Sequence, residues 1–98
     1  MSYQSKFKSP ETDQLFQAIL NLETEEECYR FFEDICTIKE IQSLSQRLQV
    51  AKLLNQNKTY NEIENLTGAS TATICRINKC LGYGADGYKL ILDKLKEE

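Results

Sequence analysis

The chain has 98 residues, which is the size of one small domain and close to the length at which a partner subunit often completes the core. Its net charge of −3 is unevenly spread, because residues 11–40 carry nine acidic and two basic side chains whereas residues 41–81 carry two acidic and five basic ones. There is no histidine, no C-x-x-C pair among the four cysteines, no 18-residue apolar run and no secretory signal. We therefore expect one domain over residues 1–98 in a cytoplasmic protein, with no metal site, no cofactor and no membrane partner.

The first two helices are predicted from their N-terminal residues and their apolar spacing. Ser9, Pro10 and an early acid are typical of a helix start, and the T-x-x-E sequence at 24–27 has the spacing of a capping box. The apolar residues that follow at helical spacing are Leu15, Phe16, Ile19 and Leu20, and then Cys28, Phe31, Phe32, Ile35 and Cys36. We expect Cys28 and Cys36 to be small reduced residues of the core.

A third helix follows a further T-x-x-E sequence at 37–40. Ile41, Leu44, Leu48 and Ala51 form one stripe, and Val50, Leu53 and Leu54 extend the apolar surface around the distal half. A helix that is apolar on several sides is enclosed by several neighbours or by a second chain.

Residues 59–81 have the pattern of a helix-turn-helix. A T-x-x-E sequence at 59–62 opens a short helix ending near Leu66, Gly68 suits a left-handed helix end, and Ser70 can cap the next helix. The apolar residues expected where the two helices cross are Ile63, Ala69, Ile74 and Ile77, with Leu66 and Leu81 extending the same inner face. A last helix, from Tyr88 to Leu95, follows the "GYGADG" break, so the fold class is all-α with about six helices.

The outward residues of the second helix are suited to DNA. They are Ser70, Thr71, Ala72, Thr73, Cys75, Arg76 and Lys79. The N-terminal part of a recognition helix meets base edges in the major groove, where small hydroxyl and methyl groups allow close approach. Arg76 could reach a phosphate or a guanine, and Lys79 a phosphate.

Other interpretations are open on these residues alone. A Ser/Thr cluster at a helix start is often only a cap, a lone arginine is often a surface ion-pair partner, and glycine turns occur in many helical proteins. The alternative function is a helical protein-interaction adaptor that uses this surface for a protein partner, which the acidic block 11–40 favours. The chain is not expected to be an enzyme, since it has no histidine and no glycine-rich phosphate loop.

The segments "EIQSLSQRLQVAKLL" (40–54) and "TYNEIENLTGASTATICRINKCLGYGADGYKLIL" (59–92) resemble the Trp repressor superfamily, within it the small YerC/YecD type. The resemblance implies an intertwined homodimer on double-stranded DNA, with operator half-sites roughly 34 Å apart. It places base reading on Thr71, Ala72 and Cys75, and phosphate contacts on Ser70, Thr73 and Lys79. Asn61 and Glu64 stand where the Trp repressor has basic residues.

The resemblance also predicts what has become of the corepressor pocket. The two arginines that enclose tryptophan in the Trp repressor correspond to Arg47 and Arg76. The glycine that leaves room for the indole corresponds to Ile77, whose side chain would fill that space. We therefore expect a vestigial pocket at Arg47, Arg76 and Ile77 that does not accept L-tryptophan, and the residues identify no other small-molecule effector.

Overall fold

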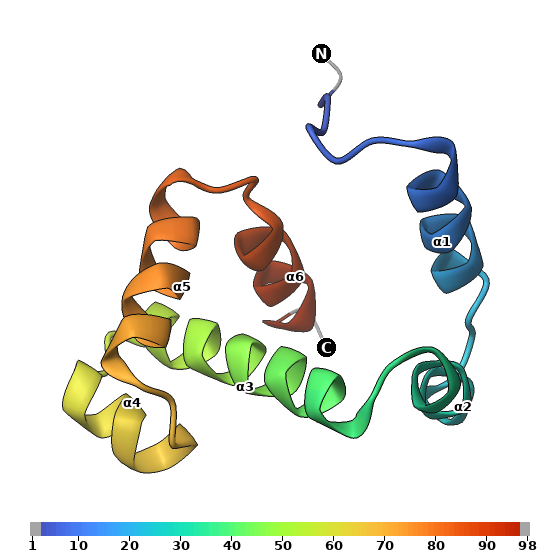
Figure 1. The fold of residues 1–98 in the computed structure, drawn as a ribbon. Helices are drawn as coiled ribbons and strands as arrows, with labels where there is room; N and C mark the ends of the chain where they lie inside the picture. Colours follow the sequence, from blue (N-terminus) through green and yellow to red (C-terminus); the bar gives the residue numbers. More distant parts are fainter. Residues whose placement is uncertain (1–2, 97–98) are drawn as a thin grey trace. The chain divides into compact units, whose positions relative to one another are not determined.

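The computed structural model describes residues 3–96, and these residues form six α-helices and no strand (Figure 1). The helices are α1 (Pro10–Leu20), α2 (Glu25–Ile35), α3 (Ile38–Asn55), α4 (Tyr60–Thr67), α5 (Thr71–Tyr83) and α6 (Gly87–Lys96). The prediction of an all-α fold with about six helices is confirmed. None of the helices in the described range is long and apolar enough to cross a membrane.

The chain divides after Ile38 into two compact units, which are described separately. The first unit contains α1 and α2, and the second contains the rest of α3 together with α4, α5 and α6. That residues 1–98 act as one domain stays a prediction.

The helices of the first unit begin at the predicted caps. The Ser9 hydroxyl accepts a hydrogen bond from the backbone N–H of Thr12 at 3.0 Å, and the Thr24 hydroxyl accepts one from the N–H of Glu27 at 3.1 Å. The Glu27 carboxylate accepts from the N–H of Glu23 at 2.8 Å, one residue before the position that a capping box requires. Thr24 and Glu27 therefore both bond to backbone N–H groups at the start of α2. The Glu27 carboxylate, however, accepts from Glu23 and not from Thr24.

The apolar faces of α1 and α2 are largely uncovered. Neither helix has a buried residue, although Phe31 and Phe32 are half-buried and meet edge to face with their ring centroids 5.4 Å apart. The exposed large side chains here are Leu15, Phe16, Leu20, Tyr29 and Ile35. Two helices alone bury too little apolar surface to enclose a core.

The expectation that Cys28 and Cys36 lie in the core is wrong for the single chain. Cys28 is exposed and Cys36 is half-buried. The periodicity placed both cysteines on the apolar face of α2, but this face has no fully buried residue.

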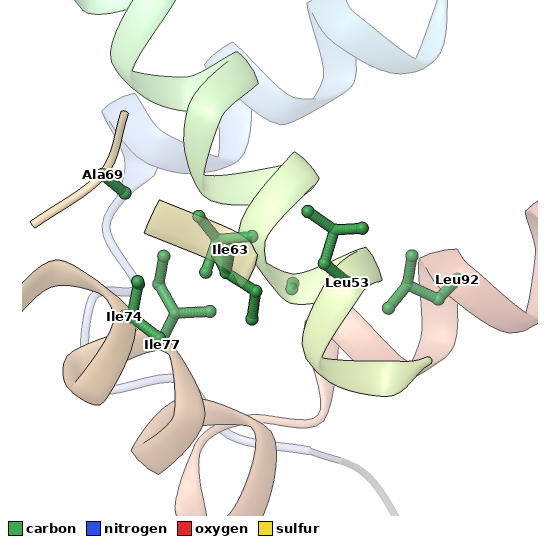
Figure 2. Packing of buried hydrophobic residues seen from close by; sticks show 8 residues of the cluster. Leu53, Ile63, Ala69, Ile74, Ile77 and Leu92 are labelled. Carbon is green, nitrogen blue, oxygen red and sulfur yellow. The ribbon is translucent and has the colours of Figure 1, made fainter. Parts of the chain in front are cut away.

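The core of the second unit lies between the distal half of α3 and the last three helices (Figure 2). Its buried residues are Val50, Ala51, Leu53, Ile63, Ala69, Ile74, Ile77 and Leu92. The prediction that the distal half of α3 is enclosed on several sides is confirmed by Val50, Ala51 and Leu53, with Leu54 packed against the cluster. Nearer the start of α3, Leu44 and Leu48 remain exposed.

Two glycines provide a matched test of the turn between α4 and α5. Gly68 has φ of 75° and an added Cβ would meet nothing within 4 Å, so only the backbone conformation opposes a larger residue. We expect Gly68→Ala to lower the free energy of unfolding by roughly 1–2 kcal/mol. Gly82→Ala, in α5 and equally free of contacts, should raise it by about 0.5 kcal/mol, because alanine favours helix. Urea unfolding followed by circular dichroism measures both, and equal effects would contradict the expectation.

Candidate nucleic-acid interface

The crossing of α4 and α5 is formed by four of the six predicted residues. Ile63 and Ile74 are fully buried, and Ala69 and Ile77 retain 4% and 3% of their exposure. Figure 2 shows the side chains of these residues gathered where the two helices meet. The second helix ends at Tyr83, two residues later than predicted.

The prediction that Leu66 belongs to this inner face is wrong, and Leu81 is only half-buried. The Leu66 side chain is 66% exposed, because Thr67 takes the inner position at the end of α4. The Thr67 hydroxyl donates a hydrogen bond to the Ile63 carbonyl at 2.7 Å and accepts one from the Ala69 N–H at 3.1 Å. The polar Thr67 therefore occupies the inward position that the sequence pattern had assigned to the apolar Leu66.

The turn itself is held by backbone and side-chain hydrogen bonds. Gly68, in the left-handed conformation, donates its N–H to the Glu64 carbonyl at 2.9 Å. From α3, the Gln46 side-chain amide donates to the Thr67 carbonyl at 3.2 Å. The buried crossing thus joins α4 to α5, and the Gln46 bond ties the end of α4 to α3.

The start of α4 carries the predicted reciprocal capping box. The Thr59 hydroxyl accepts from the Glu62 N–H at 3.1 Å, and the Glu62 carboxylate accepts from the Thr59 N–H at 2.9 Å. This bond from the Thr59 backbone holds the pKa of Glu62 below its usual range. The Glu62 carboxylate is therefore held by a hydrogen bond at the N-terminus of its own helix.

At the start of α5, Ser70 and Thr73 are occupied by capping. The Ser70 hydroxyl accepts a hydrogen bond from the Thr73 N–H at 3.2 Å, and it donates to the Thr73 hydroxyl at 3.1 Å. The interpretation of this Ser/Thr cluster as a helix cap therefore holds for Ser70 and Thr73. Their hydroxyl oxygens can still accept further hydrogen bonds.

The remaining candidates form one exposed face of α5. They are Thr71, Ala72, Cys75, Arg76 and Lys79. Their spacing of i, i+1, i+4, i+5 and i+8 places them on a single side of the helix, opposite the buried Ile74 and Ile77. Among residues 3–96, no carboxylate pairs with Arg76 or Lys79, so the surface ion pair considered from the sequence is not formed in this range.

Tyr60 lies beside this face and was not identified from the sequence. It is half-buried against the core at the first position of α4. Burial raises the pKa of the Tyr60 phenol, and the neighbouring Cys75 thiol raises that pKa further. A neutral hydroxyl group therefore lies next to Cys75 at the edge of the exposed face; the signal in the sequence was an aromatic residue directly after the Thr59 cap.

The residues of the expected vestigial pocket differ in burial and come from two helices. Arg47 is exposed on α3 and Arg76 is exposed on α5, while Ile77 packs into the core. Burial raises the pKa of Tyr88 whereas the positive charge of Arg47 opposes that rise, which places Arg47 near α6. Ile77 thus provides part of the contact between helices at the place where the sequence suggested an occupied cavity.

Two short helices, a glycine turn and an exposed second-helix face define a helix-turn-helix protein. Comparison with known proteins agrees, since the family described as Trp repressor protein matches residues 10–96. The chain belongs to the Trp repressor family. Membership places it with DNA-binding helix-turn-helix regulators rather than with enzymes.

Individual relatives match over nearly the whole chain. The uncharacterized protein YerC of Bacillus subtilis is 59% identical over 92 residues, which cover 94% of this chain and 88% of that protein. The crystal structure of a candidate Trp repressor from Staphylococcus aureus has 56% identity and a TM-score of 0.89, covering 95% of this chain and 93% of the other. A TrpR-like protein from Eubacterium eligens has 55% identity and a TM-score of 0.90, covering 93% and 94%. The predicted resemblance to the YerC type is confirmed.

Proposed function

We propose that the protein is a dimeric, sequence-specific transcriptional regulator that reads a palindromic operator through residues 70–81 of each copy. The observation that carries this proposal is the continuous exposed face of α5 opposite a fully buried one. Thr71 and Ala72 are near the N-terminus of the helix, where close approach to base edges is possible. Arg76 and Lys79, one and two turns further along, supply positive charge for phosphate.

Selection of bound fragments from random double-stranded DNA tests this proposal directly. A palindromic consensus with half-sites about one helical turn apart is the expected result. Failure to enrich any sequence, with protein shown to be folded by circular dichroism, would contradict it. Enrichment of a single unrepeated half-site would contradict the dimeric part alone.

The uncovered apolar surface supports a homodimer. In the second unit, an apolar recess of about 430 Å³ is lined by Leu48, Cys80, Gly84, Ala85, Gly87, Tyr88 and Ile91. Its Leu48 and Ile91 side chains remain 37% and 42% exposed. The exposed apolar residues of α1 and α2 are a second surface that needs covering. A second copy presents the same apolar recess and the same exposed residues of α1 and α2. Two copies can therefore cover each other's apolar surfaces, as an intertwined dimer requires.

The salt dependence of DNA binding should be shallow for a regulator of this type. Arg76 and Lys79 give four cations in a dimer, and α4 adds Asn61 and Glu64 rather than basic residues. A slope of log affinity against log salt of roughly −3 to −4 is expected, and Arg76→Ala should reduce its magnitude by about 1.8. Lys94→Gln, on α6, is the control that should leave the slope unchanged. Titrations at several salt concentrations measure the slope, and an unchanged value for Arg76→Ala would remove that residue from the interface.

The protein should not bind L-tryptophan. Ile77 is 3% exposed and packs with Ile63 and Ile74, so an indole could enter only by displacing part of the core. Calorimetric titration with L-tryptophan should show no heat of binding, and DNA affinity should be the same with and without it. Binding of L-tryptophan at micromolar concentration would contradict the conclusion that Ile77 closes the pocket.

A further inference from the structure

We propose that Gln46 of α3 is a positioning residue for DNA recognition, which fixes the start of α5 relative to α3 and so restricts the operator to one half-site spacing. The inference rests on the proposed function and deepens it, since it concerns the geometry of the palindrome. Gln46 is half-buried, and its side-chain amide donates a hydrogen bond to the Thr67 carbonyl at 3.2 Å. Because Gln46 lies on α3 and not on the exposed face of α5, it acts through α5 and not by contact with DNA.

The Thr67 carbonyl belongs to the end of α4, where a helix leaves its last four carbonyl groups without backbone donors of its own. The N–H of Gly68 goes to the Glu64 carbonyl instead. Gln46, which lies 21 positions earlier in the chain, supplies a donor to the Thr67 carbonyl. Loss of that donor would leave a half-buried acceptor in search of water, so the turn would move to expose it.

Further hydrogen bonds lead from this turn to the exposed face of α5. The Thr67 hydroxyl accepts from the Ala69 N–H at 3.1 Å, and Ala69 is itself buried. Ser70 then caps α5 through the Thr73 N–H at 3.2 Å. Thr71, the first residue proposed to meet base edges, follows Thr67 by four positions. A movement of Thr67 would therefore be passed on to the start of α5.

Gln46 is also close in sequence to the surface that we assign to a second copy. Leu44 and Leu48, two positions before and after it, are exposed, and Leu48 lines the apolar recess. In a dimer joined there, the separation of the two α5 helices depends on how each is fixed to its own α3. One base pair changes a half-site separation of roughly 34 Å by about 3.4 Å. A bond that limits small movements of α5 therefore favours one spacing over its neighbours.

Affinity for operators of different spacing tests the inference on the full chain. Gln46→Met keeps an unbranched side chain of similar length but removes the donor. It should reduce the preference for the selected spacing, over operators one base pair longer or shorter, by about three- to ten-fold, the contribution of one neutral hydrogen bond. Gln46→Lys, which retains a donor, should restore the preference, and its added charge cancels because each ratio compares two operators on one protein. An unchanged ratio for Gln46→Met would overturn the proposal.

Gln49→Met is the matched control, since Gln49 is exposed on the same helix, and it should leave the spacing preference unchanged. Amide hydrogen exchange without DNA provides a second measurement. Gln46→Met should accelerate exchange at residues 69–73, whereas Gln49→Met and Gln46→Lys should not. Unchanged exchange in folded Gln46→Met would overturn the positioning role whether or not an operator is found. Accelerated exchange in a protein whose original chain selects no operator would contradict the proposed function and support the Gln46 contact.

Discussion

Replacing Ile63 with alanine should lower the free energy of unfolding by about 2–5 kcal/mol. Ile63 is fully buried between α4 and α5, where it meets Ile74 and Ile77. Its truncation removes apolar contacts and leaves a cavity that the short helix α4 cannot close alone. Because a chain of this size has a total stability of roughly 5–15 kcal/mol, the loss is a large fraction of the whole. Urea unfolding monitored by circular dichroism measures it.

Leu66→Ala is the matched control, in the same helix and with the same kind of truncation. Leu66 is 66% exposed, so the substitution should change stability by no more than about 0.5 kcal/mol. A loss comparable to that of Ile63→Ala would show that Leu66 is covered in solution. The pair therefore separates the buried crossing from the outer surface of the helix-turn-helix.

The contrast between these two residues also marks what the sequence could predict. Capping and apolar spacing are local properties, so the start of α4 at Thr59 and the burial of Ile63 and Ile74 follow from nearby residues. Leu66 fits the same apolar pattern, yet the left-handed Gly68 ends the helix and Thr67 closes the turn. At a helix end, hydrogen bonding decides which neighbour faces inward, and apolar periodicity does not contain that information.

The first unit shows a second reason why part of the structure could not be predicted from the sequence. The sequence correctly predicted α1 and α2, but it placed Cys28 and Cys36 in a core, and neither of these helices has a buried residue. Periodicity identifies the apolar face of a helix and cannot identify what covers it. The position of Tyr60 beside Cys75 was missed for a related reason, since it depends on packing between α4 and α5.

Ile91→Glu should convert the proposed dimer into a folded monomer and weaken operator binding by about 10²–10⁴-fold. Ile91 lines the apolar recess with Leu48 and Tyr88, and a second copy that covered it would bury the new carboxylate without a partner. Such a charge costs several kcal/mol, and two-fold symmetry introduces it twice. A monomer keeps only one half-site contact, so it loses the gain from linked binding. Light scattering gives the oligomeric state, and DNA titration gives the affinity.

Lys94→Gln makes the same change in net charge on the same helix and should preserve both the dimer and its affinity. Because Ile91 is already 42% exposed in the single chain, the glutamate can reach water in the monomer, and circular dichroism should show unchanged helix content. A folded Ile91→Glu protein that stays dimeric with full affinity would mean that the recess is not covered. The copies would then have to meet through α1 and α2, whose exposed Phe16 and Leu20 become the next residues to replace.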